Sequence, residues 1–111
     1  MTAASTIGEF EQVVILAVLR LCDSAYGVTI RSEIGKCTLR APAPGALYTT
    51  LDRLEEKGLV TSRFGDPTPE RGGRAKRYFK VTAAGVQAVA RAQRNYQRLL
   101  KGLRLPGVAN A

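Results

Sequence analysis

The sequence contains no histidine and no tryptophan, and it has only one methionine and two cysteines among its 111 residues. The absence of histidine removes the most common general base and the most common metal ligand in proteins. The two thiols and the scattered carboxylates form no constellation that would carry catalysis. We therefore expect a protein that is not an enzyme and that has neither a metal site nor a cofactor.

The two cysteines, Cys22 and Cys37, stand alone, and the sequence has no C-x-x-C pair. In a reducing compartment a disulfide between them is not expected. The favoured interpretation is that both are buried structural side chains, and a redox-sensing role is the alternative.

Long hydrophobic runs are also lacking. The longest apolar run is Val13–Leu19, whereas a membrane-spanning helix needs roughly 20 apolar residues. No cluster of Lys or Arg precedes this run and Arg20 ends it, which is unlike a signal peptide. The run therefore predicts a buried helix segment, and we expect a cytoplasmic protein with no membrane partner.

Acidic residues are scarce in the second half of the chain. Residues 1–58 carry six Lys or Arg and seven Asp or Glu, whereas residues 59–111 carry eleven and two. The formal net charge is +8 at pH 7. Such an excess on a short chain favours a polyanionic partner over a charge that only keeps the protein in solution.

The length corresponds to one domain, and a hydrophobic content of 45% argues against disorder. Apolar periodicity predicts a first helix from Ile7 that is apolar nearly all round, as in helices buried between partners. Asp23 and Ser24 break this helix and are suited to cap the next one. The second helix is predicted over about Ala25–Lys36.

A third helix is predicted from Pro44, since proline suits the first turn of a helix. Leu47, Leu51 and Leu54 repeat at i, i+4 and i+7, which is one buried stripe. Lys57-Gly58 is a typical helix end.

Two segments with β character, Leu59–Phe64 and Lys76–Val81, follow the third helix. The loop between them is too long for a tight turn. Thr82 is predicted to cap a long last helix, which Pro106-Gly107 would end.

Three helices, a two-stranded wing and a long last helix describe a mainly α fold, the winged helix-turn-helix. We expect a DNA-binding domain over residues 1–81, a C-terminal dimerisation helix over 82–105 and a tail over 106–111. In this fold the third helix enters the major groove of DNA and a basic hairpin lies beside it.

Two groups of residues are the candidates for DNA contact. The N-terminus of the third helix offers free backbone N–H groups to a phosphate, and side chains opposite the leucine stripe can meet bases or backbone. The candidates on this helix are Pro44, Gly45, Tyr48, Thr49 and Arg53. The basic, glycine-bearing hairpin loop supplies Arg71, Arg74, Lys76 and Arg77. The alternatives are a packing role for Tyr48, pairing of Arg53 with Glu55 or Glu56, and a merely solvated loop.

The last helix carries apolar residues at a/d heptad spacing, and nothing later in the chain can cover them. The simplest partner is the same helix of a second copy. The predicted dimerisation residues are Val86, Val89, Tyr96, Leu100 and Leu103. Arg91, Arg94, Arg98 and Lys101 lie on the opposite side of this helix, where solvation is the favoured role and contact with flanking DNA the alternative.

Taken in order, three motifs resemble the PadR-type transcriptional regulators over about Phe10–Gly85. They are Tyr26-Gly27-Val28-Thr29-Ile30, the run from Pro44 to Val60, and the run from Gly73 to Gly85. The sequence departs from the family at Val28, where a second aromatic residue is frequent, and at Ala75, where proline is frequent. Its wing loop is also longer than in many members.

The resemblance implies a homodimeric DNA-binding regulator, usually a repressor, whose dimer is built by the last helix with help from the first. The single C-terminal helix is similar to that of the short subgroup. The family positions that carry over are Tyr48, Arg74, Lys76 and Arg77. Some relatives bind aromatic small molecules between the dimer helices, often with tryptophan, which this chain lacks. A small-molecule inducer is therefore an open alternative that no residue of the sequence supports.

We predict a sequence-specific regulator, acting as a repressor, that binds double-stranded DNA at an inverted repeat as a homodimer. One alternative is a winged helix used only for protein–protein contact, which would not explain the basic second half. Another is RNA binding, against which the low aromatic content of 6% argues.

Overall fold

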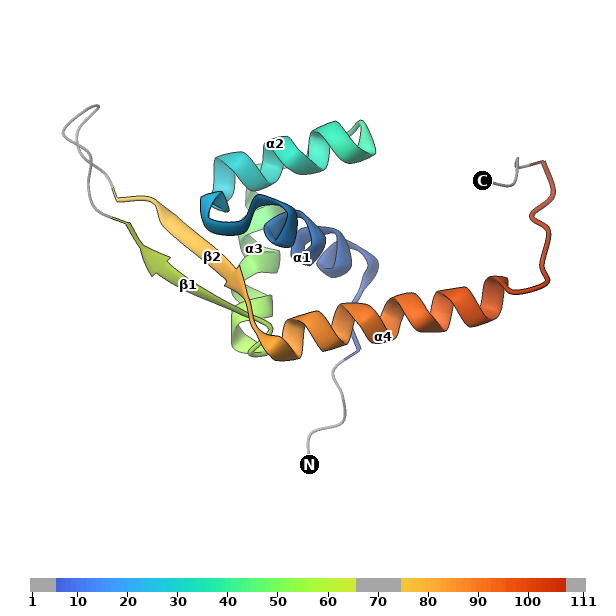
Figure 1. Cartoon of the computed structure of the whole chain (residues 1–111). Coiled ribbons are helices and arrows are strands. Elements are labelled where there is room, and N and C mark those ends of the chain that lie inside the picture. The colour runs from blue at the N-terminus through green and yellow to red at the C-terminus, as the bar shows by residue number, and fades with distance from the viewer. Residues whose placement is uncertain (1–5, 66–74, 108–111) are drawn as a thin grey trace.

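The computed structural model describes residues 6–65 and 75–107. Three helices form a bundle, a two-stranded sheet extends from it, and a fourth helix runs beneath the bundle (Figure 1). In chain order the elements are α1 (Glu9–Leu21), a 3-10 turn (Cys22–Ser24), α2 (Gly27–Thr38), α3 (Pro44–Glu56), β1 (Val60–Phe64), β2 (Arg77–Val81) and α4 (Ala83–Leu100). The predicted fold class, mainly α with a two-stranded wing and a C-terminal helix, is confirmed.

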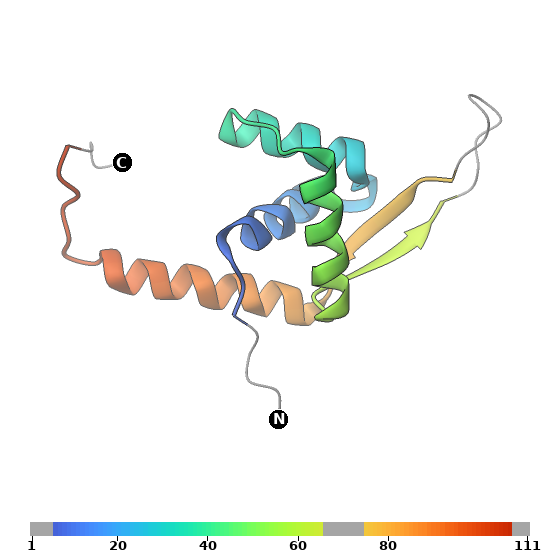
Figure 2. The ribbon, with the colours of Figure 1, turned by 180° about the vertical axis from the view of Figure 1, so that it is seen from behind.

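The core lies where α1, α2 and α3 meet, and the start of α4 closes it from below (Figure 2). Leu47, Leu51 and Leu54 are at most 1% exposed, so the predicted stripe is the inner face of α3. Burial of each such side chain contributes on the order of 1.5–3 kcal/mol before chain entropy is subtracted. The other large side chains buried completely or nearly so are Val14, Ile15, Val18, Ile30 and Val60.

The wing is an antiparallel pair in which Val60 lies opposite Val81 and Phe64 opposite Arg77. Strand β2 of the wing is bonded to the corner between α1 and α2, because the Phe79 N–H donates to the Ala25 carbonyl at 2.8 Å. This edge contact fixes the direction of the wing relative to the helices.

The helix boundaries confirm some sequence predictions and correct others. Pro44 is the first residue of α3, and the Thr82 hydroxyl accepts from the Gly85 N–H at 3.1 Å, as a cap does. The prediction that Asp23 and Ser24 cap α2 is wrong, since Tyr26 precedes that helix and its N–H donates to the Thr29 hydroxyl.

The last helix is shorter than predicted. It ends at Leu100, and Gly102 then takes a positive φ of 75°. Glycine adopts this conformation without steric cost, so the helix stops before Pro106 is reached.

Cys22 and Cys37 are both exposed and unpaired by disulfide, so the prediction that they are buried is wrong. Cys22 lies in the turn after α1, and Cys37 lies on the outer side of α2 with its thiol 3.7 Å from a Glu33 carboxylate oxygen. Within the two described stretches, no helix combines the length and the apolar character that crossing a membrane requires.

Candidate nucleic-acid interface

The outer face of α3 is open to solvent. Gly45, Thr49, Asp52 and Glu56 are all exposed, and they lie opposite the buried leucine stripe. A methyl group built at Gly45 would meet nothing within 4 Å, so the first turn of α3 is open at this position. The helical period brings these four positions to one face, and the sequence analysis had named the first two, Gly45 and Thr49, as candidates for DNA contact.

Tyr48 lies at the side of this face and leans on α2. Its side chain is 43% exposed, and its hydroxyl end packs against Gly27, where an added methyl would overlap the hydroxyl oxygen and lie 2.6 Å from Cζ. The packing role that the sequence offered as the alternative for Tyr48 is therefore present, and the side chain is still partly exposed. Its ring packs against α2, and it still presents a surface beside Thr49.

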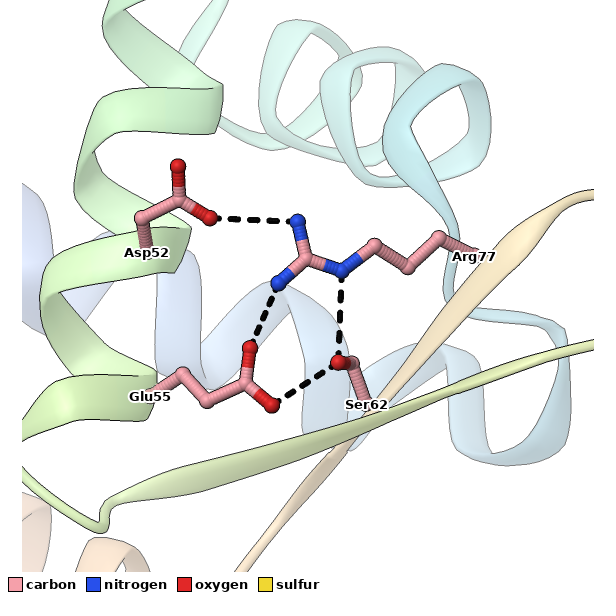
Figure 3. Close-up of polar contacts among 4 residues, drawn as sticks. All are labelled: Asp52, Glu55, Ser62 and Arg77. Atoms are coloured by element: carbon pink, nitrogen blue, oxygen red, sulfur yellow. Dashed lines mark hydrogen bonds and ion pairs between the residues drawn. The ribbon is translucent and has the colours of Figure 1, made fainter.

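Arg77 joins the wing to α3 (Figure 3). Its guanidinium donates to an Asp52 carboxylate oxygen at 3.1 Å and to a Glu55 oxygen at 2.5 Å, and its Nε–H donates to the Ser62 hydroxyl at 3.2 Å. The Ser62 hydroxyl donates in turn to the second oxygen of Glu55 at 2.8 Å. These hydrogen bonds, from Ser62 and then from Arg77, hold the pKa of Glu55 below its ordinary value despite some loss of solvent.

This network changes the interpretation of Arg77. The sequence predicted a contact between Arg77 and DNA, whereas the structure aims the guanidinium at two carboxylates of α3. Asp52 and Glu55 were absent from the predicted site. The signal that could have found them is a pair of acids three residues apart, on the helix that precedes a basic strand, because such a pair requires cations nearby.

At the base of the wing, two cationic side chains lie over aromatic rings. The Lys76 ammonium lies 4.7 Å from the centroid of the Tyr26 ring, and the Arg63 guanidinium lies 4.9 Å from that of Tyr78. The two tyrosines meet edge to face with centroids 5.4 Å apart. Cation–π contact pre-orients Lys76 at the point where the wing leaves the body. Arg71 and Arg74 lie outside the described residues.

The other predicted cation on α3, Arg53, is exposed. In the described part of the chain it forms an ion pair with neither Glu55 nor Glu56, the pairs that the sequence offered as alternatives. Its positive charge instead helps to lower the pKa of Glu11 on α1.

The apolar stripe of α4 divides into two parts. Val89 is 6% exposed and belongs to the core of its own chain, so its assignment to the dimer surface is wrong. It lies in the half of α4 that packs on α1, where Gln93 donates to Gln12 at 3.3 Å. The C-terminal half of the helix projects beyond the bundle (Figure 1). The exposed members of the predicted stripe are Val86, Tyr96, Leu100 and, after the helix end, Leu103.

A helix-turn-helix whose third helix is exposed beside a basic wing defines a class of DNA-binding protein. The family model described as the transcriptional regulator PadR-like family matches residues 15–91. The transcriptional regulator Rv3488 of Mycobacterium tuberculosis is 33% identical over 81 residues, which are 71% of this chain and 69% of the relative. The chain belongs to the PadR-like family of transcriptional regulators.

Solved structures share the fold at low sequence identity. A transcriptional regulator from Clostridium thermocellum superposes with a TM-score of 0.67 at 22% identity, covering 82% of this chain and 85% of that one. RosR of H. salinarum gives 0.68 at 22% identity, with coverage of 92% and 84%. A PadR-like transcription factor from Bacteroides fragilis gives 0.66 at 22% identity, with coverage of 83% and 84%.

Proposed function

We propose that this regulator is a homodimeric repressor that binds an inverted-repeat operator. The observation that carries the DNA-binding part of the proposal is the Arg77 network, because its hydrogen bonds join the exposed face of α3 and the wing into one surface. A surface of this kind presents a helix to the major groove and a strand pair to the adjacent backbone.

The contacts in the complex divide by chemistry. The free N–H groups of Gly45 and Ala46, which follow Pro44 in the first turn of α3, suit a phosphate. Tyr48 and Thr49 are exposed on α3 and would meet base edges through a hydroxyl or a methyl group. Lys76, together with Arg71 and Arg74 of the loop, would supply contacts to phosphates that do not depend on sequence.

The dimer would form through the exposed members of the α4 stripe, Val86, Tyr96, Leu100 and Leu103. Tyr96 is 52% exposed and Leu103 is 58% exposed. Exposure of such a row of large apolar side chains to water is unfavourable and marks a surface for interaction. Leu16 and Leu19 of α1 are also about two-fifths exposed and offer a second apolar surface. A two-fold axis relating two copies would present two α3 helices, and the site would then be an inverted repeat.

The test is selection of DNA by the wild-type protein from a randomised double-stranded pool, followed by sequencing. We expect an inverted repeat whose half-sites are separated by about one helical turn or a multiple of it. Repression is then measured with the recovered site placed across a promoter. A protein that enriches no sequence would instead be a winged helix for protein–protein contact, and a rise in reporter transcription would make it an activator.

A further inference from the structure

The outer face of α3 carries carboxylates as well as the cation Arg53, where a DNA-reading helix is expected to be neutral or basic. Asp52 and Glu56 lie on this face, and Glu55 lies beside it. A carboxylate near a phosphate is repelled, and each one should weaken binding to every sequence. An acid that remains in the middle of the face therefore requires a role that offsets this cost.

Asp52 differs from the other two acids because it faces outward and because Arg77 binds only one of its two carboxylate oxygens. It follows Gly45 and Thr49 at i+7 and i+3, so it lies on the line of α3 that faces outward. The Arg77 guanidinium holds one of its oxygens at 3.1 Å, while the side chain remains 61% exposed. The second oxygen points away from the network (Figure 3), and no hydrogen bond to it comes from the described residues.

We propose that Asp52 reads a cytosine, by accepting a hydrogen bond from its N4 amino group in the major groove. This inference rests on the proposed function and names the base that one position of the recognition surface selects. An ionised carboxylate can only accept hydrogen bonds. In the major groove cytosine presents a donor and no acceptor of its own, whereas adenine presents a donor beside an acceptor, guanine presents two acceptors and thymine presents one.

Arg77 is the positioning residue for this contact. It fixes one oxygen of Asp52, so the carboxylate enters the groove in a single orientation and little side-chain entropy is lost on binding. It also places a positive charge beside the acid, which reduces the repulsion from flanking phosphates. Glu55 takes no direct part, because its second oxygen is held by Ser62 on β1.

The experiment compares base preference for the wild type, Asp52→Asn and Asp52→Ala on the same randomised double-stranded DNA pool. In the wild type, one position of each half-site should be cytosine. Asp52→Ala should lose about tenfold discrimination there and leave the other positions unchanged. Asp52→Asn should exchange cytosine for adenine at that position, because an amide pairs with the N6 and N7 groups of adenine.

Glu56→Gln is the matched control. It removes the same charge from the same face, one turn further on, from a residue that makes no ion pair within the described part of the chain. It should raise affinity for all sequences together and leave every base preference unaltered. Thermal melting of each variant establishes that it is folded.

The inference is overturned if Asp52→Asn and Asp52→Ala keep the wild-type preference at every position, or if both only shift the affinity for all DNA as Glu56→Gln does. Failure of the proposed function is detected separately, by the selection carried out with the wild-type protein. A wild-type protein that enriches no sequence would overturn that function and this inference together.

Discussion

The phenol of Tyr48 occupies the space that any side chain at Gly27 would need. The two residues come from neighbouring helices. Because Gly27 has no Cβ, the Tyr48 ring of α3 can lie directly against the start of α2. The same contact orients the ring beside Thr49. A glycine outside the recognition helix thus helps to shape the surface of that helix.

Gly27→Ala should therefore displace Tyr48 and destabilise the domain by about 1–3 kcal/mol, the usual cost of overpacking. Chemical denaturation measures this loss. In the double variant Gly27→Ala with Tyr48→Ala the clash is absent, and the cost of the Gly27 change should shrink or reverse, since alanine favours helix. Gly45→Ala is the control, because its methyl meets open space and should not destabilise. If the stability losses of the two single variants simply add in the double variant, the Tyr48 ring does not depend on the space left by Gly27.

Tyr48→Ala tests direct readout. The variant should lose roughly 1–3 kcal/mol of binding to the operator and much less to random DNA, because only a base contact is removed. The measurement is a pair of titrations at one salt concentration. Equal losses on both DNAs would make Tyr48 a phosphate contact, and a lower melting temperature without a specific binding defect would make it a packing residue only.

Leu100→Glu tests the dimer. A charge among the exposed members of the α4 stripe should abolish a seam whose side chains each contribute about 1.5–3 kcal/mol, and sedimentation should show monomer or aggregate. Asn95→Glu adds the same charge elsewhere on the helix and should leave the dimer intact. A wild-type chain that sediments as a monomer at micromolar concentration would contradict the proposal.

Lys76→Ala tests the wing root. Removing one phosphate contact should reduce the slope of log affinity against log salt by about 0.9, equally for operator and random DNA. Lys36→Ala, at the end of α2 away from the wing, should leave the slope as it is. An unchanged slope for Lys76→Ala would place this cation away from the phosphates.

Glu11 predicts a pH dependence of stability. Burial alone would raise its pKa, but hydrogen bonds from Lys57 at 2.9 and 3.0 Å and from the Gly8 N–H at 2.8 Å outweigh this, and the pKa lies below its ordinary value. The native carboxylate therefore stabilises the fold above the unfolded pKa of about 4.3, and this stability is lost as the pH falls through the lower native pKa.

Replacing this carboxylate should flatten the acid limb of the stability curve. Glu11→Gln should cost about 1–2 kcal/mol at pH 7 and less at a pH below the native pKa of Glu11, where the wild-type group is protonated too. Denaturant titrations across this range make the comparison. A loss of the same size at both pH values would show that the charge does not contribute.

The sequence by itself determined the order and nature of the elements. The leucine stripe of α3, the proline at its start and the Thr82 cap act over a few residues, so periodicity and local hydrogen bonding suffice to predict them. The strands of the wing were predicted within one residue for the same reason. The family resemblance rested on these local motifs, and the family model confirms it.

Only the tertiary structure decided which neighbours the exposed side chains meet. Arg77 looks in the sequence like one more wing cation, but folding brings it to Asp52 and Glu55 of α3. Val89 fits the heptad stripe equally well, yet α4 crosses the bundle there and buries it. A helical period states which residues share a face and cannot state what covers that face, because the cover comes from segments far away in the chain.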